Sequence, residues 1–215
     1  MITDWEIRRQ LVRYGKKVYE KGLVAATDGN ISMRMMTDRV MITPSGVALS
    51  DLDVNDLVYV DLDGQVLQGR NKPSSELPMH LEIYRQRPEI NAVLHAHPPT
   101  TVAFTIAGET FEQPVLPELV VLFGEIPIAS YATPATEESA NSIRDLVPNY
   151  DVIVLDHHGA VTMGKSLEDA FAKMEKLEHS AKTLLAAKQM GRINPLDPSD
   201  VRKLEKMRKE KGYSN

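Results

Sequence analysis

Apolar residues spaced at helical intervals predict a long helix near each end of the chain. Across 4–21 they recur at steps of four, three and four, so one helix face is apolar. Thr3 and Glu6 fit a capping box at the start of this helix, and Gly22 marks its end. The same spacing predicts a helix over 167–191. Its expected buried face carries Phe171, Met174, Leu177 and Ala181. Shorter helices are expected at 74–86, 99–107, 114–124 and 136–147, with a last short one after Pro198.

Alternating and continuous apolar runs predict the strands. Two hairpins are expected early, at 31–43 and at 57–69, where Asp63 and Gly64 form the second turn. Buried strands are expected later, at 90–95, 126–132 and 151–159. Hairpins followed by alternating strands and helices favour a mixed, largely antiparallel sheet covered by helices.

Composition places the chain among ordinary globular proteins and excludes several classes. Its 215 residues suit one large domain, and 42% are hydrophobic and 26% charged. A net charge of −5 argues against a nucleic-acid partner, and we interpret the basic run 202–211 as a solvated helix face. There is no cysteine, which excludes disulfides and thiolate metal sites. No apolar run reaches the ~20 residues that span a bilayer, and the first ten residues lack a signal-peptide pattern. We therefore expect a cytoplasmic protein with no membrane partner.

Two histidines at the end of a predicted strand indicate a metal site. His95 and His97 lie two residues apart, so both side chains point to the same side of the strand. A lone strand histidine is more often a core residue, but a pair of buried imidazoles is costly without a partner. The predicted strand 151–159 also ends in histidines, which could supply a third nitrogen. Three imidazoles, one carboxylate and an open position describe a catalytic Zn²⁺ or a similar divalent site.

Three turns rich in small polar residues could bind an anion. They lie at 27–30, 45–46 and 74–75, and each offers backbone N–H groups and a hydroxyl or amide. Singly each is typical of an ordinary turn or cap, but beside a metal site they indicate a phosphate ester. Glu76 follows the third turn and is the natural proton-transfer group, although a first-turn carboxylate also simply stabilises a helix. His80 is four residues further on, and we expect it to support the site rather than bind the metal.

Five short motifs follow one another along the chain: G-N-I-S at 29–32, T-P-S-G at 43–46, P-S-S-E at 73–76, H-A-H-P at 95–98 and H-G at 158–159. In this order they resemble the motifs of the class II aldolase/adducin family and, within it, the L-fuculose-1-phosphate aldolase branch. The resemblance covers essentially the whole chain.

The resemblance implies a fold, an assembly and a metal. The fold would be a three-layer α/β/α arrangement around a central, mostly antiparallel sheet, as a single domain over 1–215. Four such chains would form a homotetramer with fourfold symmetry and active sites at the subunit interfaces. The metal would be Zn²⁺, with Mn²⁺ and Co²⁺ as alternatives. Its implied ligands are Glu76, His95, His97 and His158.

The resemblance also assigns roles to individual residues. Glu76 would be the acid/base, Tyr131 would reach a neighbouring active site, and Tyr213 would protonate the aldehyde oxygen. The residues implied in phosphate binding are Thr27, Gly29, Asn30, Ser45, Gly46, Ser74 and Ser75. Two positions depart from the family pattern. His157 stands where asparagine is frequent, and Glu118 lies where a second active-site tyrosine is expected.

The implied activity is a zinc-dependent lyase reaction on a ketose 1-phosphate similar to L-fuculose 1-phosphate. It would give dihydroxyacetone phosphate and a short aldehyde through a metal-stabilised enediolate. A lysine aldolase is disfavoured, because nothing supplies the desolvated pocket that Lys72 would need. Related enzymes remain alternatives, namely a ribulose-5-phosphate 4-epimerase, a methylthioribulose-1-phosphate dehydratase and a 3-oxo-tetronate 4-phosphate decarboxylase. A non-enzymatic module like the adducin head is disfavoured, because it is expected to have lost the metal ligands.

Overall fold

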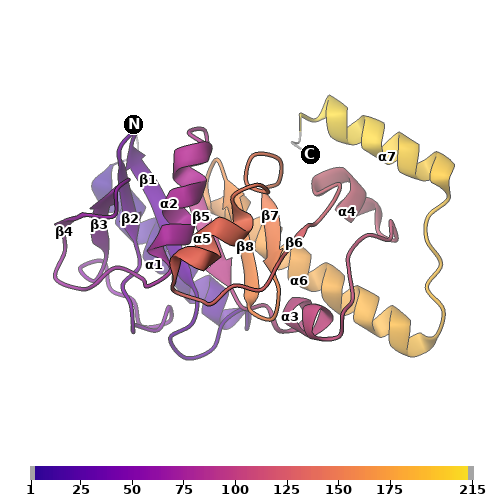
Figure 1. Ribbon diagram of the computed structural model, residues 1–215, viewed down its shortest axis with the longest axis horizontal. Helices are drawn as coiled ribbons and strands as arrows, with labels where there is room; N and C mark the ends of the chain where they lie inside the picture. Colours follow the sequence, from indigo (N-terminus) through magenta and orange to yellow (C-terminus); the bar gives the residue numbers. More distant parts are fainter. Residues whose placement is uncertain (1–2, 213–215) are drawn as a thin grey trace.

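One mixed sheet runs through residues 3–212, the part of the chain that the computed structural model describes (Figure 1). Its strands, in chain order, are β1 (Asn30–Met36), β2 (Arg39–Ile42), β3 (Val58–Asp61), β4 (Val66–Gln68), β5 (Ala92–Ala96), β6 (Ile128–Ala129), β7 (Val152–Leu155) and β8 (Gly159–Gly164). Across the sheet the order is β4-β3-β2-β1-β5-β8-β7-β6. Neighbours run antiparallel except β6 and β7, so the prediction of a mostly antiparallel sheet is confirmed.

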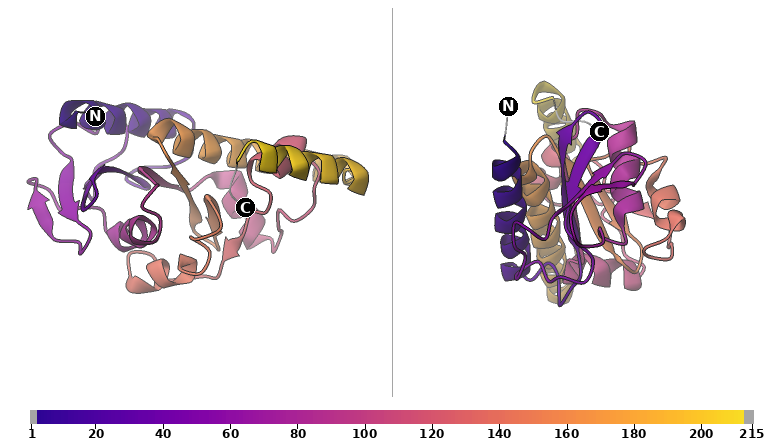
Figure 2. Two further views of the ribbon diagram at one scale, coloured as in Figure 1. Left: turned by 90° about the horizontal axis from the view of Figure 1, so that it is seen from above. Right: turned by 90° about the vertical axis from the view of Figure 1, so that its left-hand side faces the viewer.

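Helices cover both faces of the sheet and give three layers (Figure 2). The helices are α1 (Asp4–Glu20), α2 (Leu77–Gln86), α3 (Pro99–Ile106), α4 (Pro117–Leu122), α5 (Glu137–Ile143), α6 (Leu167–Met190) and α7 (Pro198–Glu210). One apolar core joins α1 and α6 to one sheet face, and a second joins α2 and α5 to the other. This is the three-layer α/β/α fold that the resemblance implied.

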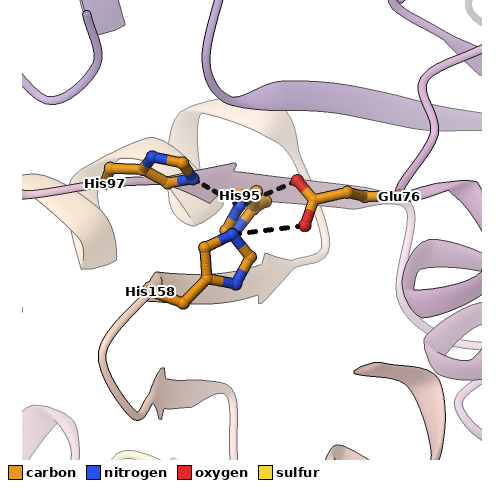
Figure 3. Close-up of side chains that lie close together, drawn as sticks. All are labelled: Glu76, His95, His97 and His158. Carbon is orange, nitrogen blue, oxygen red and sulfur yellow. Dashed lines mark hydrogen bonds and ion pairs between the residues drawn. The ribbon is translucent and has the colours of Figure 1, made fainter. Parts of the chain in front are cut away.

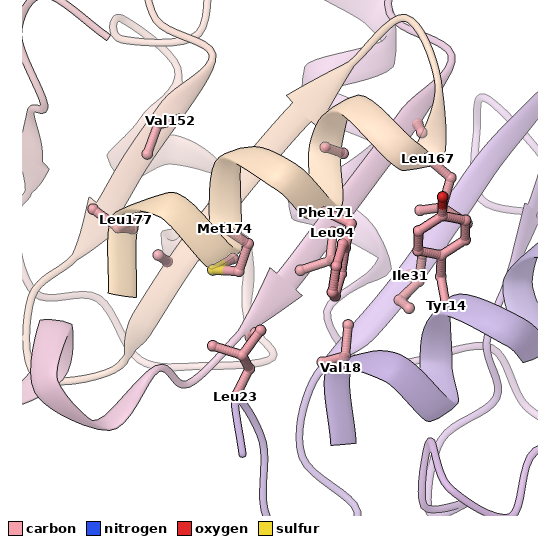
Figure 4. Close-up of a cluster of buried hydrophobic side chains, with 14 of the residues drawn as sticks. Tyr14, Val18, Leu23, Ile31, Leu94, Val152, Leu167, Phe171, Met174 and Leu177 are labelled. Atoms are coloured by element: carbon pink, nitrogen blue, oxygen red, sulfur yellow. The ribbon is translucent and has the colours of Figure 1, made fainter. Parts of the chain in front are cut away.

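The long helices form where their apolar spacing predicted. At the start of α1 the Thr3 hydroxyl accepts from the Glu6 N–H and the Glu6 carboxylate accepts from the Thr3 N–H, which completes the capping box. Where α1 crosses α6, the rings of Tyr14 and Phe171 lie 5.4 Å apart between centroids (Figure 4). The four residues of the predicted buried face of α6 are buried, namely Phe171, Met174, Leu177 and Ala181.

Several boundaries differ from the sequence prediction. The predicted strand 151–159 ends at Leu155, and a turn separates it from β8. Helix α2 begins at Leu77, not Ser74, because Ser74 is tied into a backbone bridge: its N–H donates to the Thr43 carbonyl (3.1 Å). Strand β6 covers only two residues of the predicted 126–132. Helix α5 ends at Ile143, where turns replace the predicted last helical residues.

Strand β8 was not predicted from the sequence. It carries a glycine at each end, and all six of its residues are buried between β5 and β7. A strand covered on both faces shows no apolar–polar alternation, so the usual signal is missing. Its presence matters, because β8 forms one side of the site described below.

The C-terminal helix α7 packs beside α4, away from the sheet (Figure 1). Most of its basic residues are exposed, as expected for a solvated face, but Arg208 is buried and donates to the Val121 carbonyl (3.3 Å). Among the helices within residues 3–212, none is long and apolar enough to cross a membrane.

We predict that Met174→Ala lowers the free energy of unfolding by about 2–5 kcal/mol, because it leaves a cavity in the α1–α6 core. The control on the same helix is Leu185→Ala, whose side chain is 40% exposed and whose loss should cost about 0.5 kcal/mol or less. Urea unfolding followed by circular dichroism measures both. Equal losses in the two variants would contradict the assignment of this core.

Candidate metal centre

Four potential ligands converge at one end of the central strands (Figure 3). Glu76 is the N-cap residue of α2, His95 lies in β5, His97 follows that strand, and His158 lies in the turn between β7 and β8. Their ligand atoms all lie within 4.8 Å of one another. His95 Nε2 is 3.0 Å from both His97 Nε2 and Glu76 Oε2, and His158 Nε2 is 3.4 Å from Glu76 Oε1.

Outer contacts turn the ring nitrogens of His95 and His97 toward the centre. The Nδ1–H of His95 donates to the Ala160 carbonyl (3.0 Å), an atom that can only accept. A neutral His95 therefore presents a bare lone pair at Nε2. His97 Nδ1 lies 3.5 Å from the Asp28 carboxylate, which favours the same tautomer. Such outer partners orient imidazole ligands in metal sites.

An unpaired oxygen shows that these residues fit a cation. Among the described residues, Glu76 Oε1 is the one buried side-chain polar atom without a hydrogen-bond partner. The carboxylate and two imidazole lone pairs face one another at about 3 Å, an arrangement that repels unless positive charge lies between them. Nitrogen and carboxylate ligands in this number suit Zn²⁺ and similar divalent ions.

The electrostatics keep the side chains in the protonation states that metal ligands need. Burial lowers the pKa of His158 to about 4, and nearby His95 adds to the shift. The same two causes lower the pKa of His97. Burial alone would raise the pKa of Glu76, but His95 and a hydrogen bond from Asn30 outweigh it, so this pKa lies well below its ordinary value. Near neutral pH, the ionised Glu76 carboxylate therefore faces the neutral imidazoles of His97 and His158.

Two glycines let the backbone come close to the histidines. Gly29 has φ +75°, and a Cβ there would lie 3.0 Å from the His95 carbonyl oxygen and 2.5 Å from Val24 Cγ1. A Cβ on Gly159 would press on the Ala96 carbonyl and lie 3.1 Å from His95 Cε1. Side chains at these positions would displace the ligand strand or its ring.

Hydrogen bonds connect the three predicted anion-binding turns to Glu76 or to one another. Backbone bonds join the segments that carry the turns at 45–46 and 74–75, including a bond from the Ser45 N–H to the Lys72 carbonyl (3.0 Å). The turn at 27–30 runs into β1, where Asn30 pairs with His95 and its side-chain amide donates to Glu76. Thr27, Ser45 and Ser75 are exposed, whereas Ser74 is buried.

The cluster does not include Tyr131, His157 or Glu118, which the sequence also singled out. Tyr131 is 63% exposed after β6, and Tyr213 lies outside the described residues. His157 has φ +56° and turns to Asp156, with its Nδ1 2.8 Å from the carboxylate. Glu118, on α4, pairs with Lys176 of α6. Sequence reasoning took Asp28 only as a turn residue, since contact with His97 depends on tertiary structure.

Comparisons with known proteins agree on the family. A sequence profile described as "Class II Aldolase and Adducin N-terminal domain" matches residues 9–185. The 5-deoxy-D-ribulose 1-phosphate aldolase of Bacillus thuringiensis serovar kurstaki is 35% identical over 96% of each chain. The 3-oxo-tetronate 4-phosphate decarboxylase of Haemophilus influenzae is 31% identical over 95% of this chain and 98% of that one. A solved L-fuculose 1-phosphate aldolase superposes with a TM-score of 0.86 at 29% identity, covering 95% of this chain and 96% of that one.

We predict that His158→Ala lowers the bound divalent metal, because it removes one of four converging ligands. His157→Ala is the matched control, since this neighbouring histidine faces Asp156. Metal content of the purified proteins, measured by mass spectrometry after dialysis against trace Zn²⁺, distinguishes them. Loss of metal in His157→Ala with retention in His158→Ala would reverse the assignment.

Proposed function

Because the chain belongs to the class II aldolase and adducin family, we propose that it is a zinc-dependent lyase that cleaves a ketose 1-phosphate. The products would be dihydroxyacetone phosphate and a short aldehyde. The observation that carries this proposal is the cluster of Glu76, His95, His97 and His158 beside three turns rich in small polar residues. A relative named as an aldolase of a ketose 1-phosphate, 35% identical over nearly the whole chain, supports it.

In this proposal the three histidines and Glu76 hold Zn²⁺, with Mn²⁺ and Co²⁺ as alternatives. The bound ion would act as a Lewis acid that polarises the substrate carbonyl and stabilises the negative charge that develops on cleavage. Glu76 moves the proton on the carbon that becomes part of dihydroxyacetone phosphate. Its low pKa keeps it ionised before the substrate enters, and Oε1 has no hydrogen-bond partner among the described residues.

The phosphate would lie against the three predicted anion-binding turns. Backbone N–H groups of glycine-rich turns and serine hydroxyls are suitable partners for a phosphate. Bonds between the segments that carry Ser45 and Ser74 hold two of these turns together. We assign this role to Thr27, Gly29, Asn30, Ser45, Gly46, Ser74 and Ser75.

The aldehyde half would meet residues from the exposed side and from a neighbouring subunit. A surface groove of about 520 Å³ is lined by residues that include His157, Ser130 and Ile106. Tyr131 is the next residue in the chain after Ser130. Ile106 and Tyr131 are more than half exposed, which suits burial in an assembly. We propose a homotetramer of single-domain chains, 1–215, in which Tyr131 reaches a neighbouring active site and Tyr213 protonates the aldehyde oxygen.

A second candidate is decarboxylation of a phosphorylated 3-oxo acid. The relative named 3-oxo-tetronate 4-phosphate decarboxylase is 31% identical over nearly the whole of both chains. This reaction would use the same cluster and phosphate turns, since loss of CO₂ next to a ketone also leaves negative charge on the carbonyl oxygen. Sugar-phosphate epimerases and dehydratases need the same two sites. The intact ligand set argues against a purely structural module.

We predict that the Zn²⁺-loaded protein releases dihydroxyacetone phosphate from a ketose 1-phosphate. The assay incubates it with a panel of ketose 1-phosphates, pentulose 5-phosphates and 3-oxo-4-phosphate acids, with products identified by NMR. The His158→Ala protein is the control for contaminating activity. Release of CO₂ from an acid, with ketose 1-phosphates untouched, would replace the aldolase proposal with the decarboxylase.

We predict that Glu76→Gln slows exchange of solvent deuterium into dihydroxyacetone phosphate by about 10²–10⁴-fold, the usual contribution of a general base. Tyr131→Phe should show the opposite pattern, with normal exchange but slow cleavage, because it acts on the aldehyde half. NMR follows exchange, and a coupled assay follows cleavage. Normal exchange in a metal-loaded Glu76→Gln protein would exclude Glu76 as the base.

A further inference from the structure

A row of hydrogen-bonded, buried side chains leads from Tyr84, near the C-terminal end of α2, to Glu76 at its N-cap. Tyr84 Oη lies 2.9 Å from Ser32 Oγ, which lies 2.7 Å from His80 Nδ1. His80 Nε2 lies 2.6 Å from Asn30 Oδ1, and Asn30 Nδ2 donates to Glu76 Oε2 (2.9 Å). We call these five side chains the buried row; the first three are at most 1% exposed.

The periodicities of a strand and a helix place the row. Asn30 and Ser32 lie two residues apart on β1, so they share a sheet face. His80 and Tyr84 lie four residues apart on α2, so they share a helix face that packs on that sheet. Along the row, residues of helix α2 therefore alternate with residues of strand β1. The row ends at Glu76, the N-cap residue of the same helix.

Chemistry fixes the direction of every hydrogen bond in the row. The Glu76 carboxylate can only accept, so Asn30 must turn its NH₂ toward Glu76 and its carbonyl oxygen toward His80. His80 then has to donate from Nε2. Burial lowers the pKa of His80 to about 3, with nearby His95 contributing, so the ring is neutral and its Nδ1 accepts from Ser32. Ser32 in turn accepts from Tyr84.

The hydrogen bond from His80 Nε2 to Asn30 Oδ1 therefore fixes the orientation of the Asn30 amide. A rotated Asn30 amide would point its oxygen at a carboxylate oxygen, which is repulsive in a buried place. With Asn30 held, Oε2 of Glu76 carries a hydrogen bond and Oε1 carries none. The two oxygens of one carboxylate are thus made unequal.

We propose that His80 is a positioning residue that, through Asn30, holds the Glu76 carboxylate at the metal cluster with Oε2 bonded and Oε1 free. This rests on the proposed function, because it takes Glu76 as both ligand and base. His80 itself touches neither metal nor substrate. A purely structural role would need only a buried side chain of the same size, whereas positioning requires a donor at Nε2.

The test measures Co²⁺ binding, with Co²⁺ as a coloured probe, by chelator competition and by its visible absorption spectrum. His80→Phe should weaken binding by about 10–100-fold, the usual effect of losing an outer-shell partner, and change the spectrum. His80→Gln should restore most of the affinity, because its amide NH₂ can donate to Asn30 from about the same place. Tyr84→Phe removes a buried hydrogen bond at the far end of the row and should leave binding unchanged.

A measurement on the unchanged protein accompanies the variants. Long-range ¹⁵N–¹H spectra should show His80 as the neutral Nε2–H tautomer; the Nδ1–H tautomer would overturn the proposal even if His80→Phe does not fold. Unchanged Co²⁺ binding and spectrum in a folded His80→Phe protein, or no recovery in His80→Gln, would also overturn it. In those cases the metal site stands. Failure of the wild-type protein itself to bind Co²⁺ would remove the proposed function, and this proposal with it.

Discussion

A charged carboxylate buried among imidazoles is the constraint around which this structure is organised. Removing Glu76 from water is costly unless positive charge and hydrogen bonds compensate. Asn30 supplies one hydrogen bond to this carboxylate, and a cation held by the cluster would supply the positive charge. Asn30 and the histidines of the cluster lie in separate parts of the sequence, and they meet because β5 lies between β1 and β8 at the centre of the sheet. The sheet order is thus what makes the site possible.

Each ligand that the sheet supplies is also oriented by a neighbouring segment. Strand β8 offers the Ala160 carbonyl to His95, and the turn before β1 offers Asp28 to His97. Glu76 lies at the N-cap of α2, and His80 on the same helix points back toward β1. This one segment therefore supplies both the carboxylate and the residue that supports it through Asn30. The ligand geometry therefore depends on strand register. A one-residue slip of β1 against β5 would move Asn30 and its amide to the opposite face.

The sequence predicted those features that depend on local pattern. Three such features are the capping box of α1, the two hairpins and the paired histidines, and each follows from residues close together in the chain. The structure contains the capping box and the hairpins as predicted, and it brings His95 and His97 together. The sequence did not predict β8, because a completely buried strand shows no alternation of apolar and polar residues. It also did not predict where α2 starts. Ser74 has a high propensity for the N-cap position, but its N–H instead forms a backbone hydrogen bond with Thr43, which is distant in the sequence. The helix therefore begins after Ser74. Asp28 was missed for the same reason.

The division between the two halves of the site explains why substrate identity is harder to infer than chemistry. The metal ligands and their outer partners are largely buried in the sheet, where packing and charge compensation permit few alternatives. The groove beside His157 and the segment carrying Tyr131 are exposed, and substitutions there cost the fold little. Relatives with similar overall sequences are accordingly named for different phosphorylated substrates and for two reactions, aldol cleavage and decarboxylation. Both reactions leave negative charge on a carbonyl oxygen, so the same kind of charge-stabilising centre suits either of them. The groups around that centre would then decide which reaction occurs.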